Sequence, residues 1–336
     1  MYLPDHPLAE ADQPQRYVST GTLPDRVSIA GLLGAAYVRF AGVTDGALSQ
    51  VYPALAEADP GAFGIALTGV GGAQYAAGDA GVGFTLMSLT KPFVFALACE
   101  AFGLRAVRRL VGVNATGLPF NSAQAVERTS DGRTNPMVNA GAIATTSAIP
   151  GADLDERWTV VHEGLSRFAG RPLALDEATP ASARATNFQN RALAMLLRGA
   201  GALVGDPLEA VELYTLQCCL QVSATDLATM GAVLADGGVH PVTGERVVSQ
   251  AVARATLAVM SIAGMYESSG DWLLDVGAPG KSGISGGVLV VSPGKGALGV
   301  FSPPLDTEGN SVRGQLVARF LARELGLDVL GSVPAQ

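Results

Sequence analysis

Hydrophobic positions divide the chain into strand-like ends and a helical middle. Residues 61–70, GAFGIALTGV, alternate in character and precede a Gly-Gly turn, which predicts a strand. Residues 286–304, GGVLVVSPGKGALGVFSPP, read as two apolar strands joined by a Pro-Gly turn. Residues 93–102, FVFALACEAF, are apolar on all sides, which predicts a buried helix. Both chain ends therefore supply strands, and the middle supplies helices.

Capping residues predict where further helices begin. Asp206 followed by Pro207 is an N-cap with proline in the first turn, and it opens the segment LEAVELYTLQCCL. Ser223 and Asp226 form a capping-box pattern ahead of LATMGAVLA. A last helix is predicted over about 311–325. Its apolar stripe consists of Val317, Phe320, Leu321 and Leu325.

These elements predict an α+β fold, in which an antiparallel sheet built from both chain ends has flanking helices and an inserted helical domain. We expect residues 29–87 and 267–336 to form the α/β sheet domain and residues 88–266 to form the helical domain. The active site is expected between the two. Residues 1–28 are polar and rich in proline, which predicts an N-terminal extension that lies on the surface or is partly disordered.

Composition and charge narrow the class of function. The chain has 336 residues, of which 48% are hydrophobic, and it can bury a large core. A net charge of -8 gives no basic face for nucleic acid or an anionic membrane, so we expect a small-molecule ligand. No segment approaches about 18 uninterrupted apolar residues, and the N-terminus lacks the pattern of a signal peptide. We therefore expect neither export nor a membrane span.

Cysteine and histidine suggest no metal or redox chemistry. Cys99, Cys218 and Cys219 lie in apolar helical stretches without metal-type spacing, which favours reduced core residues and a cytoplasmic protein. His6 lies in the N-terminal segment, His162 among helical residues and His240 in the loop GGVHPVTGE. A Ser-His-acid triad needs a histidine beside Ser88, so it is not expected. No pair of ligand-type residues recurs at metal spacing on one face, and no metal site is predicted.

The stretch MSLTKPF, residues 87–93, places Ser88 three residues before Lys91. On a helix these side chains share a face, and a buried lysine with a lowered pKa can take a proton from serine. Pro92 disfavours helical angles at Lys91, so the helix should begin at about Leu89 with Ser88 at its mouth. The spacing also arises by chance: residues 292–295, SPGK, repeat it in a Pro-Gly turn that we interpret as structural.

A second segment, KSGISGG at residues 281–287, favours a catalytic Ser88–Lys91 pair over chance spacing. Lys281, Ser282 and Gly283 form the K-[ST]-G element that accompanies S-x-x-K in serine β-lactamases and penicillin-binding proteins. The alternative is a plain glycine-rich start of a strand. All three lysines of the chain lie in this segment, in MSLTKPF or in SPGK.

Further segments carry a longer resemblance. In chain order they are LAEADPGAFGIAL, MSLTKPF, GLPFNS, NPMVNAGAI, QNRALAMLL, DLATMGAVLADGGVHPVTGERV, GMYESSGDW, KSGISGG and VFSPPLDTEGNSVRG. From about residue 35 to 327 the chain resembles the serine-dependent glutaminases. This resemblance implies a β-lactamase/transpeptidase-like fold, hydrolysis of L-glutamine to L-glutamate and ammonia, and neither metal nor cofactor. It also implies a homodimer or homotetramer.

The resemblance assigns roles to residues. Ser88 would attack the side-chain carboxamide carbon, Lys91 would take its proton, and Tyr266 of GMY would help to pass a proton to the leaving ammonia. The backbone N–H groups of Ser88 and Ile284 would stabilise the oxyanion.

Three more positions match those that hold the amino-acid end of glutamine: Asn139, Asn190 and Tyr214. From the residues alone, Asn190 reads equally as a helix N-cap and Tyr214 as a core aromatic. Only their register with the family favours substrate contact.

Two positions depart from the family. The family has a glutamate that contacts the substrate α-amino group, and Ala183 occupies its position here. The family also has a tyrosine at the position that Val51 occupies, and the tyrosine of this chain, Tyr52, stands one residue later. Removing one partner of a buried charge pair costs about 3–5 kcal/mol. Glutamine would then bind poorly, unless a one-residue slip brings Glu177 or another acid into the role.

Three hypotheses follow. The first is a glutaminase with a compensated pocket. The second is an amidohydrolase of the same serine–lysine mechanism that acts on another side-chain, N-substituted or γ-glutamyl amide. The third is a non-catalytic, penicillin-binding-like protein, which retention of Ser88, Lys91 and Tyr266 disfavours because a binding protein needs no nucleophile.

Overall fold

The computed structural model describes residues 22–332 of the chain. Most of the predicted extension, together with His6, lies outside the described residues. Helix α1 (Arg26–Phe40) begins within the last three residues of that predicted extension. Its N-cap is Asp25, whose carboxylate accepts hydrogen bonds from Val27 N–H and Ser28 N–H.

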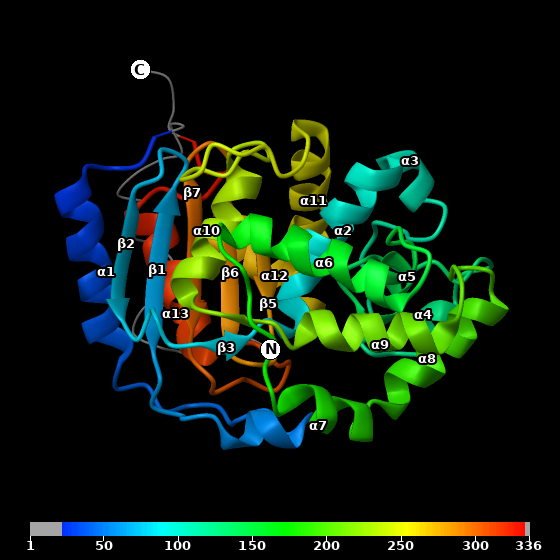
Figure 1. Cartoon of the computed structure of the whole chain (residues 1–336). Coiled ribbons are helices and arrows are strands. Elements are labelled where there is room, and N and C mark those ends of the chain that lie inside the picture. Colours follow the sequence, from blue (N-terminus) through cyan, green and yellow to red (C-terminus); the bar gives the residue numbers. More distant parts are fainter. Residues whose placement is uncertain (1–21, 333–336) are drawn as a thin grey trace.

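One five-stranded antiparallel sheet forms the centre of the α/β region, in the order β2-β1-β7-β6-β5 (Figure 1). Its strands are β1 (Gly64–Gly69), β2 (Gln74–Gly78), β5 (Gly280–Ser282), β6 (Gly287–Ser292) and β7 (Gly296–Phe301). The pairing of β1 with β7 joins the two chain ends, with Ile65 opposite Val300. The predicted sheet and the hairpin across the Pro-Gly turn are therefore confirmed.

Strands β1, β5, β6 and β7 are buried on both faces, because their side chains alternate between two hydrophobic clusters, whereas the edge strand β2 is exposed at alternate positions. One face, which includes Ile65 and Val300, packs against α1 and α13 (Val312–Glu324), with α12 (Ser269–Val276) at the side. The other face, which includes Leu289 and Ala297, packs against α10 (Ala224–Ala235). Figure 1 shows the resulting order: outer helices, sheet, α10, and then the remaining helices.

The rest of the described chain is mainly helical and lies on the α10 side of the sheet (Figure 1). Its helices are α2 (Thr90–Phe102), α3 (Leu104–Val107), α4 (Gln124–Glu127), α5 (Asn139–Ser147), α6 (Leu154–Ala169), α7 (Thr179–Thr186), α8 (Phe188–Gly199), α9 (Pro207–Cys218) and α11 (Gln250–Ala263). Short elements complete it: η1 (Pro53–Glu57), η2 (Met87–Leu89), η3 (Tyr266–Ser268), β3 (Phe84–Thr85) and β4 (Gln221–Val222). Helix α10, which belongs to the predicted helical domain, packs directly on the sheet. The division into two domains at residues 88 and 266 stays a prediction.

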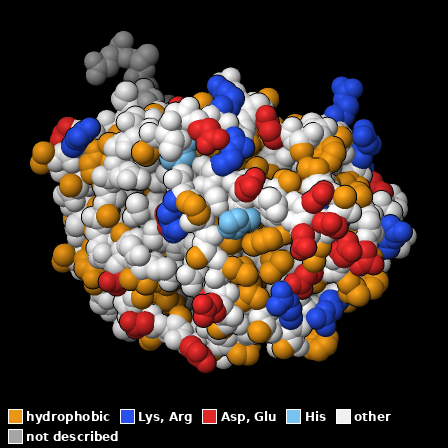
Figure 2. Space-filling model, viewed as in Figure 1, with side chains coloured by type: hydrophobic (Ala, Val, Ile, Leu, Met, Phe, Trp, Pro, Cys, Tyr) orange, Lys and Arg blue, Asp and Glu red, His pale blue; other side chains and the backbone are white. Residues whose placement is uncertain are grey.

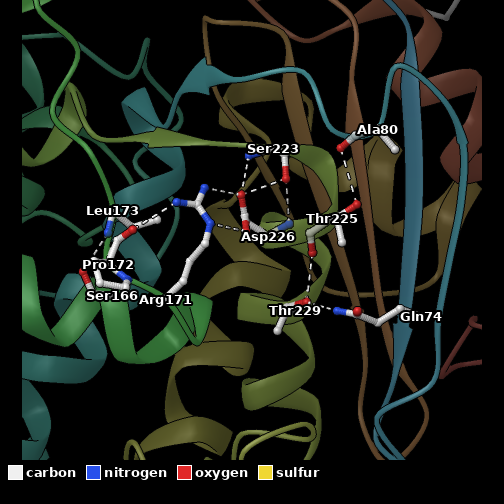
Figure 3. Close-up of polar contacts among 10 residues, drawn as sticks. All are labelled: Gln74, Ala80, Ser166, Arg171, Pro172, Leu173, Ser223, Thr225, Asp226 and Thr229. Atoms are coloured by element: carbon white, nitrogen blue, oxygen red, sulfur yellow. Dashed lines mark hydrogen bonds and ion pairs between the residues drawn. The ribbon is translucent and has the colours of Figure 1, made fainter.

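The predicted helix starts are present. Asp206 caps α9, and Ser223 and Asp226 form both bonds of a capping box at α10. Arg171 at the end of α6 adds a bidentate ion pair to the Asp226 carboxylate (Figure 3). This ion pair connects the end of α6 to the first turn of α10, the helix that packs on the sheet.

Several compositional expectations can be compared with the described residues. Cys99, Cys218 and Cys219 are buried and free, as predicted. Within residues 22–332, no helix combines the length and hydrophobicity that a membrane span requires. Figure 2 shows basic side chains as separate spots among acidic and apolar ones on the face that it draws.

Candidate active site

Ser88 lies in a strained turn between the short strand β3 and helix α2. Leu86 N–H donates to Leu220 O and fixes the approach to the turn. The next residue, Met87, has a φ of 46°, in the left-handed region that costs free energy for a residue with a side chain. Helix α2 begins at Thr90, one residue after the predicted start, so Ser88 stands just ahead of it as expected. Ser88 is 6% exposed.

Lys91 is held in the first turn of α2, and its side chain is 1% exposed. Its amine donates to Met137 O at 3.2 Å and to Asn139 Oδ1 at 2.8 Å, so neither bond goes to Ser88. Burial lowers the pKa of Lys91 to about 7, although Cys218 nearby acts in the opposite direction. A large fraction of this lysine is therefore neutral near pH 7.

Asn139 links Lys91 to the other predicted substrate contacts. The Nδ2 atom of Asn139 donates to Asn190 Oδ1 at 3.0 Å, and the hydroxyl of Tyr214 donates to Asn139 Oδ1 at 3.4 Å. These side chains come from α5, α8 and α9. Asn190 is thus inside a helix with its amide in a polar network, so its reading as an N-cap is wrong.

Tyr266 closes the other side of Ser88. Its φ of 56° makes it, with Met87, one of two non-glycine residues with positive φ among residues 22–332. Its hydroxyl donates to Ser282 O at 3.2 Å and is hydrogen bonded to the Ser88 hydroxyl. Burial raises the pKa of Tyr266, while the bond with Ser88 acts in the opposite direction. The phenol therefore stays protonated at neutral pH.

The KSGISGG segment lies against the Ser88 turn. A Cβ built on Gly283 would be 3.0 Å from Leu89 Cγ, so the strand end and the turn are in close contact. A Cβ on Gly309 would be 3.7 Å from Ile284 Cγ2 and 3.9 Å from Tyr266 Cε2. Ile284 and Tyr266 therefore flank the same glycine.

Lys281 is fully buried beside Tyr266. Its amine donates to Ser282 O at 2.6 Å and Gly264 O at 3.0 Å, and it lies 4.4 Å from the centroid of the Tyr266 ring. Burial, and then repulsion from Lys91, hold the pKa of Lys281 well below its usual range. Lys295 of SPGK instead donates to Gly326 O at 2.6 Å, far along the chain from the site, in accord with the structural interpretation.

Two further residues at the site, Phe120 and Cys218, were not predicted from the sequence to lie there. The Phe120 ring packs against Tyr266 with centroids 4.6 Å apart and lies 5.9 Å from Lys91 Nζ. Cys218 contacts Thr90, with its sulfur 4.0 Å from Thr90 Oγ1. Phe120 belongs to the quoted GLPFNS segment, which was the only signal for it.

The two departures from the family fare differently. Val51 is 52% exposed and points away from the core, while the half-buried Tyr52 hydroxyl is hydrogen bonded to Asn190. A tyrosine hydroxyl is therefore present despite the one-residue shift. Ala183 is 1% exposed on α7, and Glu177 is exposed to solvent.

Neither His162 nor His240 is hydrogen bonded to Ser88; each bonds to the backbone near it in the chain. His162 Nε2 is 2.7 Å from Leu173 O, and His240 Nδ1 accepts from Val242 N–H and Thr243 N–H. Both therefore have local structural bonds. Over the described part of the chain, no three His, Cys, Asp or Glu side chains are grouped as a metal site.

Comparison with known proteins decides the family. The family profile described as Glutaminase matches residues 46–330 of the chain. The chain belongs to the glutaminase family. Within this family it is 57% identical over 318 residues to "Glutaminase 2" of Yersinia pestis, covering 95% of this chain and 94% of that protein. It is 46% identical over 283 residues to a glutaminase of Brucella canis, covering 84% and 89%.

Solved structures of glutaminases share the β-lactamase/transpeptidase-like fold of this family member. A "Probable glutaminase ybaS" superimposes with a TM-score of 0.87 at 41% identity and covers 90% of this chain and 99% of that one. The glutaminase YbgJ of Bacillus subtilis, in a covalent complex with 5-oxo-L-norleucine, gives a TM-score of 0.82 at 29% identity and covers 90% and 99%.

Proposed function

We propose that this chain hydrolyses L-glutamine to L-glutamate and ammonia through an acyl-enzyme on Ser88. The observation that carries the proposal is the burial of Lys91, with a pKa lowered to about 7, one helical turn from Ser88. The Bacillus subtilis relative forms a covalent complex with 5-oxo-L-norleucine. Such a complex needs a nucleophile in that protein, and Ser88 is the nucleophile proposed here.

Lys91 is the proposed general base. A neutral amine has two N–H donors and one lone pair. The carbonyl of Met137 and the Oδ1 atom of Asn139 accept from the two donors, which leaves the lone pair for the proton of Ser88. The Ser88 oxygen then attacks the carboxamide carbon of the substrate, and the Ser88 and Ile284 N–H groups stabilise the oxyanion.

Tyr266 is the proposed proton carrier to the leaving group. Its hydroxyl lies beside Ser88, and its raised pKa keeps the proton on the phenol until the amide nitrogen takes it. Tyr266 then recovers the proton that Lys91 took from Ser88, so both side chains return to their starting states. Collapse of the tetrahedral intermediate then releases ammonia and leaves the γ-glutamyl ester of Ser88. In the second half of the reaction Lys91 takes a proton from a water molecule that attacks this ester. The Ser88 oxygen recovers that proton as it leaves, and glutamate is released.

Asn139, Asn190 and Tyr214 are the proposed contacts to the amino-acid end of the substrate. Their amide and hydroxyl groups form one network that Tyr52 extends. At Ala183, however, a methyl group stands where the family has a carboxylate. This observation favours one second candidate, an amidohydrolase that prefers amides whose α-nitrogen carries no charge.

The decisive variant is Ser88→Ala. It should abolish ammonia release while leaving the thermal unfolding midpoint within a few degrees, because only one buried oxygen is lost. Residual turnover above about a tenth of the wild-type rate would remove Ser88 from the mechanism. The assay should compare glutamine, asparagine, N-acyl-glutamine and γ-glutamyl amides. Release from blocked amides alone would favour the second candidate.

We also propose a cytoplasmic homodimer or homotetramer, as the family resemblance implies. The three free, buried cysteines support a reducing compartment. Light scattering coupled to gel filtration measures the assembly directly, and a monomer at micromolar concentration would contradict it.

A further inference from the structure

The carbonyl of the peptide group between Met87 and Ser88 accepts hydrogen bonds from Thr90. The hydroxyl of Thr90 donates to Met87 O at 3.0 Å, and the backbone N–H of Thr90 donates to the same carbonyl. Met87 O and Ser88 N–H are the two ends of one peptide group. The contacts made by Thr90 therefore act on the group whose N–H is the proposed oxyanion donor.

A chain of buried side chains continues behind Thr90. The hydroxyl of Thr146, on α5, donates to Gln217 Oε1 at 3.2 Å. The Nε2 atom of Gln217, on α9, donates to Thr90 Oγ1 at 3.4 Å. All three side chains are buried, and each donates to the next group in one direction, from Thr146 through Gln217 and Thr90 to Met87 O. Hydrogen bonds aligned in this way polarise one another in a medium of low dielectric constant.

The strain at Met87 makes this support necessary. A φ of 46° is unfavourable for methionine and persists only where surrounding contacts fix it. An accepted hydrogen bond at a carbonyl draws electron density from the peptide nitrogen, so the N–H at the other end becomes a better donor. The chain thus fixes the direction of the Ser88 N–H and also strengthens it.

We propose that Thr90, supported by Gln217, is a positioning residue that orients the Ser88 N–H toward the oxyanion. This inference rests on the proposed function, because it assigns that N–H to the transition state of amide hydrolysis. The contribution should appear in kcat, since the oxyanion forms only after the substrate has bound.

The first experiment replaces the hydroxyl by a methyl group in Thr90→Val. Complete removal of an oxyanion donor costs about 100-fold or more in kcat, so misdirection of one donor should lower kcat by about tenfold. KM for glutamine should change less than about twofold. Thr90→Ser keeps the hydroxyl and should restore kcat to within about twofold of wild type. A Thr90→Val enzyme with wild-type kcat would overturn the proposal.

Thr145→Val is the matched control. Thr145 is equally buried, and its hydroxyl donates to a backbone carbonyl, Gly141 O, at 2.7 Å. It should lose similar stability in thermal unfolding but keep the wild-type kcat. An equal loss of kcat in both valine variants would mean that any buried hydroxyl has the same effect, and the specific role would be rejected.

The single variant Gln217→Met tests the chain even if Thr90→Val does not fold, and it should lower kcat because Thr90 loses its supporting donor. Where Thr90→Val folds, Gln217→Met should have the smaller effect, and the double variant should equal Thr90→Val alone, because Gln217 acts only through Thr90. Additive losses, or an unchanged kcat in Gln217→Met, would contradict the relay. Ser88→Ala distinguishes failure of the proposed function from failure of this inference. Residual activity in Ser88→Ala overturns the proposed function. An inactive Ser88→Ala together with a fully active Thr90→Val overturns only the positioning role of Thr90.

Discussion

Lys91 shows at the scale of one residue how a fold changes the chemistry of a side chain. A lysine in water is almost fully protonated at pH 7 and cannot accept a proton. Here burial lowers the pKa to about 7, and the nearest polar atoms are carbonyl oxygens rather than carboxylates. An oxygen that carries no full charge satisfies the N–H groups without stabilising the ammonium form strongly.

The pH dependence of the reaction should follow from this pKa. The neutral amine is the active form of the base, so kcat/KM should rise with pH and level off above an apparent pKa of about 7. Lys91→Arg should be inactive over the same range, because a guanidinium does not deprotonate. The measurement is kcat/KM for glutamine between about pH 5.5 and 8.5. A flat profile would exclude Lys91 as the base.

Ala183 gives a second prediction at this scale. Ala183→Glu should raise kcat/KM for glutamine by at least about tenfold, because it supplies a carboxylate for the α-ammonium group. It should not improve hydrolysis of an N-acyl-glutamine, which lacks that charge. Ala185→Glu, on the exposed side of the same helix, is the control for added charge and should change neither rate. An unchanged or lower kcat/KM in Ala183→Glu would show that this position does not limit glutamine turnover.

At the scale of elements, helix α10 depends on its first turn. The Ser223 hydroxyl accepts from Asp226 N–H at 3.1 Å, and the Asp226 carboxylate accepts from Ser223 N–H at 2.7 Å (Figure 3). Arg171, two residues after the end of α6, forms an ion pair with the same carboxylate. The cap therefore satisfies the end of the helix and fixes its position over the sheet.

Ser223→Ala should lower the free energy of unfolding by about 1 kcal/mol, because the N–H of Asp226 in the first turn of α10 loses its acceptor. Ser249→Ala is the matched control, since Ser249 occupies the N-cap of α11 but makes no side-chain cap bond. It should change the free energy by less than about 0.5 kcal/mol. Urea unfolding of both variants measures the difference, and equal effects would show that the capping box contributes nothing specific.

For the whole molecule, the close packing of α10 on the sheet connects the helical region to the strands. A Cβ built on Gly231 would lie 2.5 Å from Leu289 Cδ1 and 2.7 Å from Ala297 Cβ. The glycine thus lets the helix approach β6 and β7 closely. Gly34, in the middle of α1, has no atom within 4 Å of such a Cβ.

The same substitution should therefore have opposite effects at these two glycines. Gly231→Ala should destabilise the protein by about 1–3 kcal/mol, because the added methyl group pushes the helix from the sheet. Gly34→Ala should stabilise it by about 0.5–1 kcal/mol through helix propensity. Differential scanning calorimetry of both variants tests this. Stabilisation by Gly231→Ala would show that the helix and sheet are not in rigid contact.

The fold was more predictable than the site. Hairpin β6–β7 and the starts of α9 and α10 depend on neighbours a few residues apart, and the local pattern indicated them correctly. The network of Asn139 and Asn190 joins residues 51 positions apart, and no periodicity encodes such a contact. The effect of the shift at Tyr52 was misjudged for the same reason. Its position in the sequence differs from that of the family's tyrosine by one residue, but in the fold its hydroxyl still reaches Asn190.

The sequence by itself determined which segments become strands and helices, and it supplied Ser88 and Lys91 one turn apart. Backbone preferences and side-chain periodicity act over a few residues, so they are legible in the chain. Only the tertiary structure decided that Lys91 is buried among carbonyls and that Met87 and Tyr266 adopt positive φ on either side of the site. Burial and strain arise from distant segments packed together, because the dielectric environment of a group depends on everything that surrounds it.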